Sequence, residues 1–138
     1  PVAEPVDSRS SAESPAIVAA RTMVGDAIVG GDVDVVVAAY LELARALIDD
    51  HQLAAAAASL EEGIDFLTVG GFGEAPEPTW RLMLSLSALY AGIGDPIRAR
   101  RTAIAGRDHA ASVQSDVGQD RAQALIHRLV LGHQLAAE

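Results

Sequence analysis

The side chains that could bind a metal ion in this sequence are four histidines and 19 carboxylates. His127 and His133 are the closest pair of histidines, and on a helix their spacing is about 600° of rotation, which places them on different faces. His109 follows Asp108 directly, but adjacent residues of a helix diverge. The chain contains no cysteine, which excludes disulfides and thiolate zinc sites. We therefore expect no metal site and no cofactor.

Two adjacent carboxylate pairs, Asp49-Asp50 and Glu61-Glu62, have the residue types that acid–base catalysis needs. Catalytic carboxylates must converge on a pocket, which adjacent residues do not do, so we interpret these pairs as charges at a helix end and on a solvent face. The glycine-rich strings GGDVD and GGFGEAPEP lack the Gly-Lys-Ser/Thr ending of a phosphate-binding loop. The sequence predicts a protein that is not an enzyme.

The net charge of the chain limits the classes of partner that it can bind. The formal net charge is −9, and every cation is an arginine because the chain has no lysine. An acidic domain repels phosphate backbones, so we expect no direct nucleic-acid binding. Arginines nevertheless cluster between residues 98 and 107, where Arg98 and Arg101 form a possible secondary patch for an acidic segment; ordinary solvated charge is the alternative. The absence of both lysine and asparagine suggests the genome of a high-GC bacterium.

Length and composition indicate one domain of 138 residues with a linker before it. Half of the residues are apolar but only 4% are aromatic, and the abundance of alanine favours closely packed helices. Residues 1–13 are rich in proline, serine and alternating charge, which predicts a flexible linker and hints at a longer protein. No apolar run reaches the ~18 residues of a membrane span, and the N-terminal residues lack the pattern of a signal peptide. We expect a cytoplasmic protein.

Local signals divide residues 14–138 into about six helices. Ser14 with Pro15 and Asp95 with Pro96 have the residue types of helix starts, Asp32 can cap another helix, and Asp116 with Gln119 suits a capping box. The predicted interruptions are Gly30-Gly31, the turn 49–52, the loop 70–78 and Gly94. The 3.6-residue period predicts buried stripes, and their large members include Ile17, Val24, Ile28, Val36, Tyr40, Leu47, Leu60, Leu67, Leu82, Leu86, Leu89, Ile93, Ile97, Ile104, Leu125 and Ile126.

An internal repeat supplies the expected fold. The string His51-Gln52-Leu53-Ala54-Ala55 recurs as residues 133–137, and in both places it is interpreted as the turn after a helix. Three segments share the same residue types at the same spacing, a pattern that we call the repeat register. In the central segment its residues are Met83, Leu86, Ser87, Tyr90, Gly94, Asp95, Ala99, Ala103 and Gly106. The first segment has Tyr40, Leu43, Ala44, Leu47, His51, Gln52, Ala56, Leu60 and Gly63, and the third has Ala122, Leu125, Ile126, Leu129, His133 and Gln134. In this pattern the chain resembles degenerate tetratricopeptide repeats, at about 37–69, 80–113 and, in part, 119–138. The interval from Tyr40 to Met83 is longer than the family's repeat.

The resemblance implies an all-α, right-handed array of antiparallel helix hairpins, a tetratricopeptide-like superhelix whose concave groove binds a peptide or helix of a partner protein. The groove positions would be Leu41, Glu42, Arg45, Asp49, Arg81, Leu84, Ser85, Ala88, Gln123 and His127, with Asp120 and Ala124 beside them. Such a scaffold suits a bacterial signalling or regulatory system. Two alternatives stay open: a sensor or regulatory domain of a transcription activator or Ser/Thr kinase, and a homo-oligomerisation domain in which a neighbouring copy completes the third hairpin.

Overall fold

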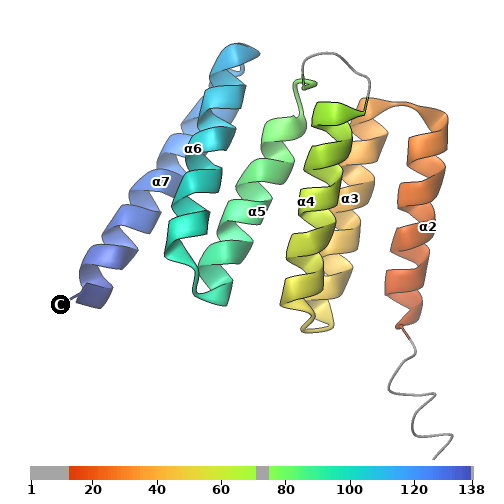
Figure 1. Cartoon of the computed structure of the whole chain (residues 1–138), viewed down its shortest axis with the longest axis horizontal. Helices are drawn as coiled ribbons and strands as arrows, with labels where there is room; N and C mark the ends of the chain where they lie inside the picture. The colour runs from red at the N-terminus through yellow and green to blue at the C-terminus, as the bar shows by residue number, and fades with distance from the viewer. Residues whose placement is uncertain (1–12, 71–74, 138) are drawn as a thin grey trace, which may run out of the picture.

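The computed structural model describes residues 13–70 and 75–137, and every regular element among them is an α-helix. The six helices are α2 (Pro15–Gly30), α3 (Val33–Asp49), α4 (Leu53–Val69), α5 (Thr79–Ile93), α6 (Pro96–Ser112) and α7 (Asp116–Ala137). Successive helices run in opposite directions and form a row from α2 to α7 (Figure 1). The prediction of an all-α chain with six helices is confirmed for this part of the chain. Residues 1–12 of the expected linker and Phe72 of the glycine loop lie outside the described residues.

Three helices begin where the sequence predicts, because the capping residue lies next to them in the chain. The Ser14 hydroxyl accepts a hydrogen bond from the N–H of Ile17 at 3.3 Å, and Pro15 is the first residue of α2. The Asp95 carboxylate caps α6 in the same way, with Pro96 at the first position. The Asp32 carboxylate accepts from the first N–H groups of α3. Each side chain satisfies backbone donors that the helix itself leaves unpaired.

The turns between helices also match the expectations. Gly31 ends α2 with φ 77°, and Gly94 ends α5 with φ 96°, so both have the left-handed conformation that glycine adopts without strain. His51, in the predicted turn after α3, has φ 60°. The α5–α6 connection is therefore a tight hairpin, as the Gly-Asp-Pro sequence predicts.

The start and the far end of α7 differ from the predictions. Ser115, rather than Asp116, is the capping residue: its hydroxyl accepts the N–H of Gly118 at 3.0 Å, and Asp116 is already the first helical residue. The predicted capping box is therefore wrong, because the residue three positions after the cap is Gly118, which has no side chain to complete it. His133 and Gln134 lie within α7 rather than in a turn, so the prediction of a turn there is wrong. The five-residue string is identical at 51–55 and 133–137, but only the first copy contains a turn between two helices.

The helices pack in an alternating order. Each helix contacts the next one along the chain, and in addition α3 contacts α5 and α5 contacts α7. No corresponding contact joins α2 to α4 or α4 to α6 among the described residues. The helices α3, α5 and α7 thus lie close together in one layer, while α2, α4 and α6 are spaced apart on the other side.

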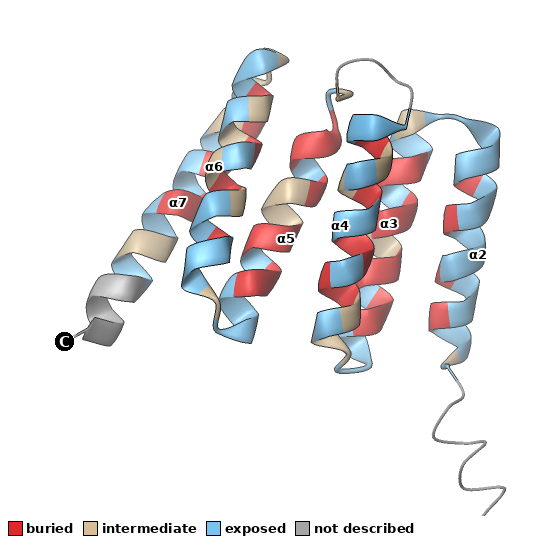
Figure 2. Ribbon diagram, viewed as in Figure 1, coloured by how far each residue is buried: buried red, intermediate tan, exposed pale blue. Residues whose placement is uncertain are grey.

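The core follows the sides on which neighbouring helices face each other (Figure 2). Its largest fully buried members are Ile17, Val36, Tyr40, Leu47, Leu60, Leu67, Trp80 and Leu82. Two glycines allow close approach between helices: a Cβ on Gly63 would lie 2.8 Å from Tyr40 Cγ, and one on Gly106 would lie 2.8 Å from Leu84 Cδ2. Both glycines occupy the small-residue position of the predicted repeat, which explains that preference as close packing.

Three isoleucines predicted to be buried are exposed: Ile28, Ile93 and Ile97. On α2 the buried residue at this level is Ala27 rather than Ile28, and Ile93 lies in the last turn of α5. Ile97 is 71% exposed because α6 turns Ala99, Ala103 and Ala110 toward its neighbours instead. Periodicity favours the larger apolar side chain, but close packing selects the alanines.

Trp80 is the core residue that the repeat register overlooks. It is 2% exposed, and its Nε1–H donates to Glu77 at 3.1 Å. A Cβ on Gly118 would lie 2.8 Å from its ring, so the start of α7 packs directly on the start of α5. The single tryptophan therefore fixes α7 against α5.

Candidate functional site

A shallow cleft of about 340 Å³ lies between α5 and α7, on the layer that also contains α3. Its lining residues are Leu84, Ser85 and Ala88 from α5 and Arg121, Ala124, Leu125 and Arg128 from α7. The three α5 residues are members of the predicted groove, and Leu84 and Ser85 precede Ala88 by four and three residues, which brings each of them to its side of the helix. The structure therefore brings the middle of the predicted groove together with α7.

Close packing behind α5 determines which of its residues reach the cleft. Leu86, Ser87 and Leu89 are buried on the other side, and the approach of Gly106 holds Leu84 between α5 and α6. Leu84 and Ser85 are consequently half-buried and Ala88 is exposed. Leu84 and Leu125 give the cleft apolar surface, and the short side chains of Ser85, Ala88 and Ala124 let a ligand approach the helix backbones closely.

Arginines surround this apolar surface. The guanidinium carbons of Arg81 and Arg121 lie 5.5 and 5.8 Å from the centroid of the Trp80 ring, a cation–π geometry. Arg121 and Arg128 are seven residues apart on α7 and both line the cleft. No ion pair joins any of these three arginines to a carboxylate in residues 13–70 and 75–137. The cleft is a basic site in an acidic chain.

The predicted groove residues of α3 do not line this cleft. Arg45 and Glu42 pair with each other at 3.2 Å on the exposed side of α3, Leu41 is half-buried, and Asp49 is the exposed last residue of the helix. Because α3 contacts α5, these residues belong to the same layer as the cleft but lie further along it.

The α7 residues show where sequence reasoning missed a candidate. Gln123 and His127 are exposed but lie outside the lining, which instead includes Arg121 and Arg128. The signal in the sequence was the seven-residue spacing of these two arginines with Ala124 and Leu125 between them. On a helix about two turns cover seven residues, so the spacing alone puts both guanidinium groups on one face.

The two arginines of the predicted secondary patch, Arg98 and Arg101, lie in different environments. Arg98 pairs with Asp95 at 3.6 Å and lies over the Tyr90 ring, with its guanidinium carbon 5.7 Å from the centroid. The Tyr90 hydroxyl in turn donates a hydrogen bond to Glu61 of α4. Burial, followed by this bond to Glu61, raises the pKa of Tyr90 above its ordinary value. Arg98 thus belongs to a network across α4, α5 and α6.

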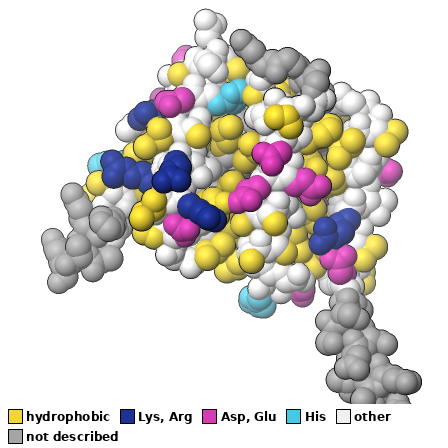
Figure 3. Space-filling view, viewed as in Figure 1, with side chains coloured by type: hydrophobic (Ala, Val, Ile, Leu, Met, Phe, Trp, Pro, Cys, Tyr) yellow, Lys and Arg dark blue, Asp and Glu magenta, His cyan; other side chains and the backbone are white. Residues whose placement is uncertain are grey.

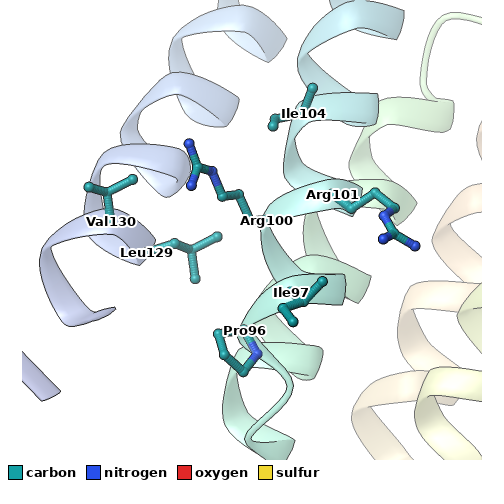
Figure 4. A pocket seen from close by; sticks show the side chains of 7 residues that line it. All are labelled: Pro96, Ile97, Arg100, Arg101, Ile104, Leu129 and Val130. Atoms are coloured by element: carbon teal, nitrogen blue, oxygen red, sulfur yellow. The ribbon is translucent and has the colours of Figure 1, made fainter. Parts of the chain in front are cut away.

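Arg101 lines a second cleft, about 550 Å³ in volume, between α6 and α7. The lining residues are Pro96, Ile97, Arg100, Arg101, Ile104, Leu129 and Val130. Figure 4 shows Ile97 beside Pro96 at the start of α6 and Ile104 further along the helix, with Arg100 directed toward α7 and Arg101 leaving α6 on the other side. This surface is apolar in the centre and basic on both flanks.

The described residues also bear on two other features, metal sites and membrane spans. They contain no group of three or more histidine, aspartate and glutamate side chains that could hold a metal ion. None of the helices there is both long and apolar enough to cross a membrane. The linings of the two clefts combine apolar side chains with arginines.

Comparison with known proteins gives no match: no protein-family model fits the sequence, and searches of curated proteins and of solved structures find none that is similar.

Proposed function

We propose that this chain is a protein–protein interaction module that binds a peptide or helix of a partner on the α3–α5–α7 layer, within a bacterial signalling or regulatory system. The observation that carries the proposal is the α5–α7 cleft, with an apolar floor around Leu84 and Ala88 and two arginines, Arg121 and Arg128, that have no carboxylate partner among the described residues. Arginine without a partner in a partly apolar site is a typical anchor for a bound carboxylate.

The packing order supports a tetratricopeptide-like, right-handed superhelix as the scaffold. In such an array the first helices of successive hairpins form one continuous surface, which corresponds here to the contacts of α3 with α5 and of α5 with α7. The close approaches of Gly63 to Tyr40 and of Gly106 to Leu84 fit the small-residue position of that repeat. A surface made of rigid helices holds a ligand with little loss of order in the protein.

The partner that suits this surface is a segment with acidic residues beside small apolar ones. The short side chains of Ser85, Ala88 and Ala124 leave room for apolar groups, while Arg121 and Arg128 attract carboxylates. The nearby Arg81 adds a third positive charge at the end of the cleft.

Selection from a random peptide library displayed on phage tests the proposal. We expect the chain to enrich acidic peptides. We expect the variants Ala88→Glu and Arg128→Glu each to bind synthetic copies of those peptides with an affinity about tenfold or more lower, equivalent to about 1.4 kcal/mol of binding free energy. Ala105→Glu is the matched control, because Ala105 is exposed on α6 and lines neither cleft.

Enriched peptides that bind the two cleft variants as tightly as the wild-type chain would place the site elsewhere and refute the proposal. Failure to enrich any sequence would also count against it. Thermal unfolding of each variant shows that a loss of binding is not a loss of folding.

A further inference from the structure

The helix α2 has an apolar face that no described part of the chain covers. It contacts α3 alone, whereas each of α3 to α6 packs between two chain neighbours. Val18, Gly25 and Val29 share one stripe on its far side, at spacings of seven and four residues. Val18 is 51% and Val29 88% exposed, and a Cβ on Gly25 would meet nothing within 4 Å. Thr22 lies between Val18 and Gly25 on the same stripe, and its hydroxyl donates to the Val18 carbonyl at 3.1 Å. The stripe is therefore mainly apolar and open to close approach.

At the opposite end of the row, the outer side of α7 is likewise left uncovered by the described helices. Beside α7, the described residues include no helix that continues the spaced layer of α2, α4 and α6. The 550 Å³ cleft between α6 and α7 borders that position, with Ile97, Ile104 and Val130 exposed or half-buried in its wall (Figure 4). A helix placed there would contact α7 as α6 contacts α5, and would cover the cleft.

Charge makes the two ends complementary. Residues 79–138 contain seven arginines against five acidic residues, a formal charge of +2, whereas residues 1–78 contain three arginines against 14 acidic residues, a formal charge of −11. Arg100 and Arg101 at the cleft have no carboxylate partner among the described residues. In Figure 3 most of the dark-blue side chains lie toward α6 and α7 and several acidic ones over α4, while a dark-blue group lies beside an acidic one toward α2. The acidic half of one molecule therefore attracts the basic half of another. At the α2 end itself, Arg21 pairs with Glu13, which leaves Asp26 and Asp32 as the net acidic charge.

We propose that copies of this chain associate head to tail, with α2 of one copy docked in the α6–α7 cleft of the next. The docked helix continues the spaced layer, covers Ile97 and Ile104 with the Val18–Val29 stripe, and brings the acidic half of one copy to the arginines of the other. Such a contact joins two different surfaces, so it leaves a free end at each side and builds open chains rather than closed dimers. It is separate from the peptide-binding surface between α5 and α7.

Sedimentation velocity over micromolar to millimolar concentrations tests this association. We expect the wild-type chain to form species that grow with concentration and that shrink in high salt, because screening weakens the attraction between the ends. Val29→Arg blocks the α2 end and Ile97→Glu blocks the cleft end, so each variant alone should remain monomeric. Both side chains are exposed, which makes the substitutions compatible with folding.

An equimolar mixture of the two variants gives the distinguishing result. The intact cleft of Val29→Arg can accept the intact α2 of Ile97→Glu, so the mixture should form a one-to-one heterodimer and nothing larger. Val69→Arg is the matched control, because Val69 is 82% exposed at the end of α4 and lies at neither surface; it should assemble like the wild type.

Three results would overturn the proposal: a wild-type chain that is monomeric throughout, a single variant that assembles like the wild type, or a mixture that forms no heterodimer. If Ile97→Glu unfolds, Arg101→Glu blocks the same end and the same outcomes apply. A symmetric dimer through α2 would show itself as association of Ile97→Glu alone, which also rejects the head-to-tail contact.

Discussion

The Ser87 hydroxyl donates a hydrogen bond of 2.5 Å to the backbone carbonyl of Ala99, from the middle of α5 to the first turn of α6. Both residues are fully buried, and both have small side chains. The bond requires the two helices to lie close together, and it satisfies a hydroxyl that would be costly to bury alone. This contact fixes the α5–α6 hairpin, from which Leu84 and Ala88 reach one cleft and Ile97 and Ile104 the other.

Enlarging Ala99 should open this hairpin. Ala99→Leu adds three carbon atoms at a site with no exposed surface, and we expect it to lower the free energy of unfolding by about 1–3 kcal/mol through overpacking. Urea denaturation followed by circular dichroism measures the change. Ala105→Leu on the exposed side of α6 is the control and should change little. Equal stabilities of the two variants would contradict the close packing described for Ala99.

Two glycine substitutions should have opposite effects. Gly63→Ala places a Cβ 2.8 Å from Tyr40 Cγ, so α3 and α4 must move apart and the protein should lose stability. Gly92→Ala in α5 meets nothing within 4 Å, and there the better helix propensity of alanine should raise stability by about 0.5–1 kcal/mol. Thermal melts of the two variants provide the comparison. A stabilising Gly63→Ala would show that the α3–α4 approach is looser than the structure has it.

The hydrogen bond from Tyr90 to Glu61 predicts a loss of stability at alkaline pH. Burial and this bond raise the pKa of Tyr90, so the folded protein holds the phenolic proton more tightly than the unfolded chain does. The resulting stability is complete below the ordinary tyrosine pKa of about 10 and is lost as the pH rises through the higher folded value. Denaturation at a series of alkaline pH values should show a decline that is shallower in Tyr90→Phe. Part of the decline should remain, because burial also raises the pKa of Tyr40; identical slopes would exclude a role for Tyr90.

Trp80 should report the docking of α7 on α5. It is the single tryptophan of the chain, and its buried ring packs against Gly118. We expect blue-shifted fluorescence emission in the native state. We expect Trp80→Ala to lower the free energy of unfolding by about 3–5 kcal/mol. Gly118→Ala should shift the emission toward the red, since an added Cβ would press on the ring. Native emission typical of a solvent-exposed indole would argue against this packing.

The sequence by itself determined where most of the helices begin and end, with the start and the far end of α7 as the exceptions. Ser14, Asp32 and Asp95 cap helices through bonds to residues two or three positions away, and Gly31 and Gly94 end helices through their own backbone conformation. These interactions are local, so the residue types suffice to predict them. The small-residue positions at Ser87, Ala99, Gly63 and Gly106 also follow from the repeat register, because close helices require them there.

Only the tertiary structure decided which side of each helix faces a neighbour. Arg121 and Arg128 line the α5–α7 cleft because Gly118 packs on Trp80, a contact between residues far apart in the chain that sets the rotation of α7 about its axis. In the same way, α6 buries Ala99 and Ala103 and leaves Ile97 at the surface. Periodicity ranks side chains by their hydrophobicity, but the distance between helix axes determines which side chain fits. That distance depends on several helices together, and it created both clefts.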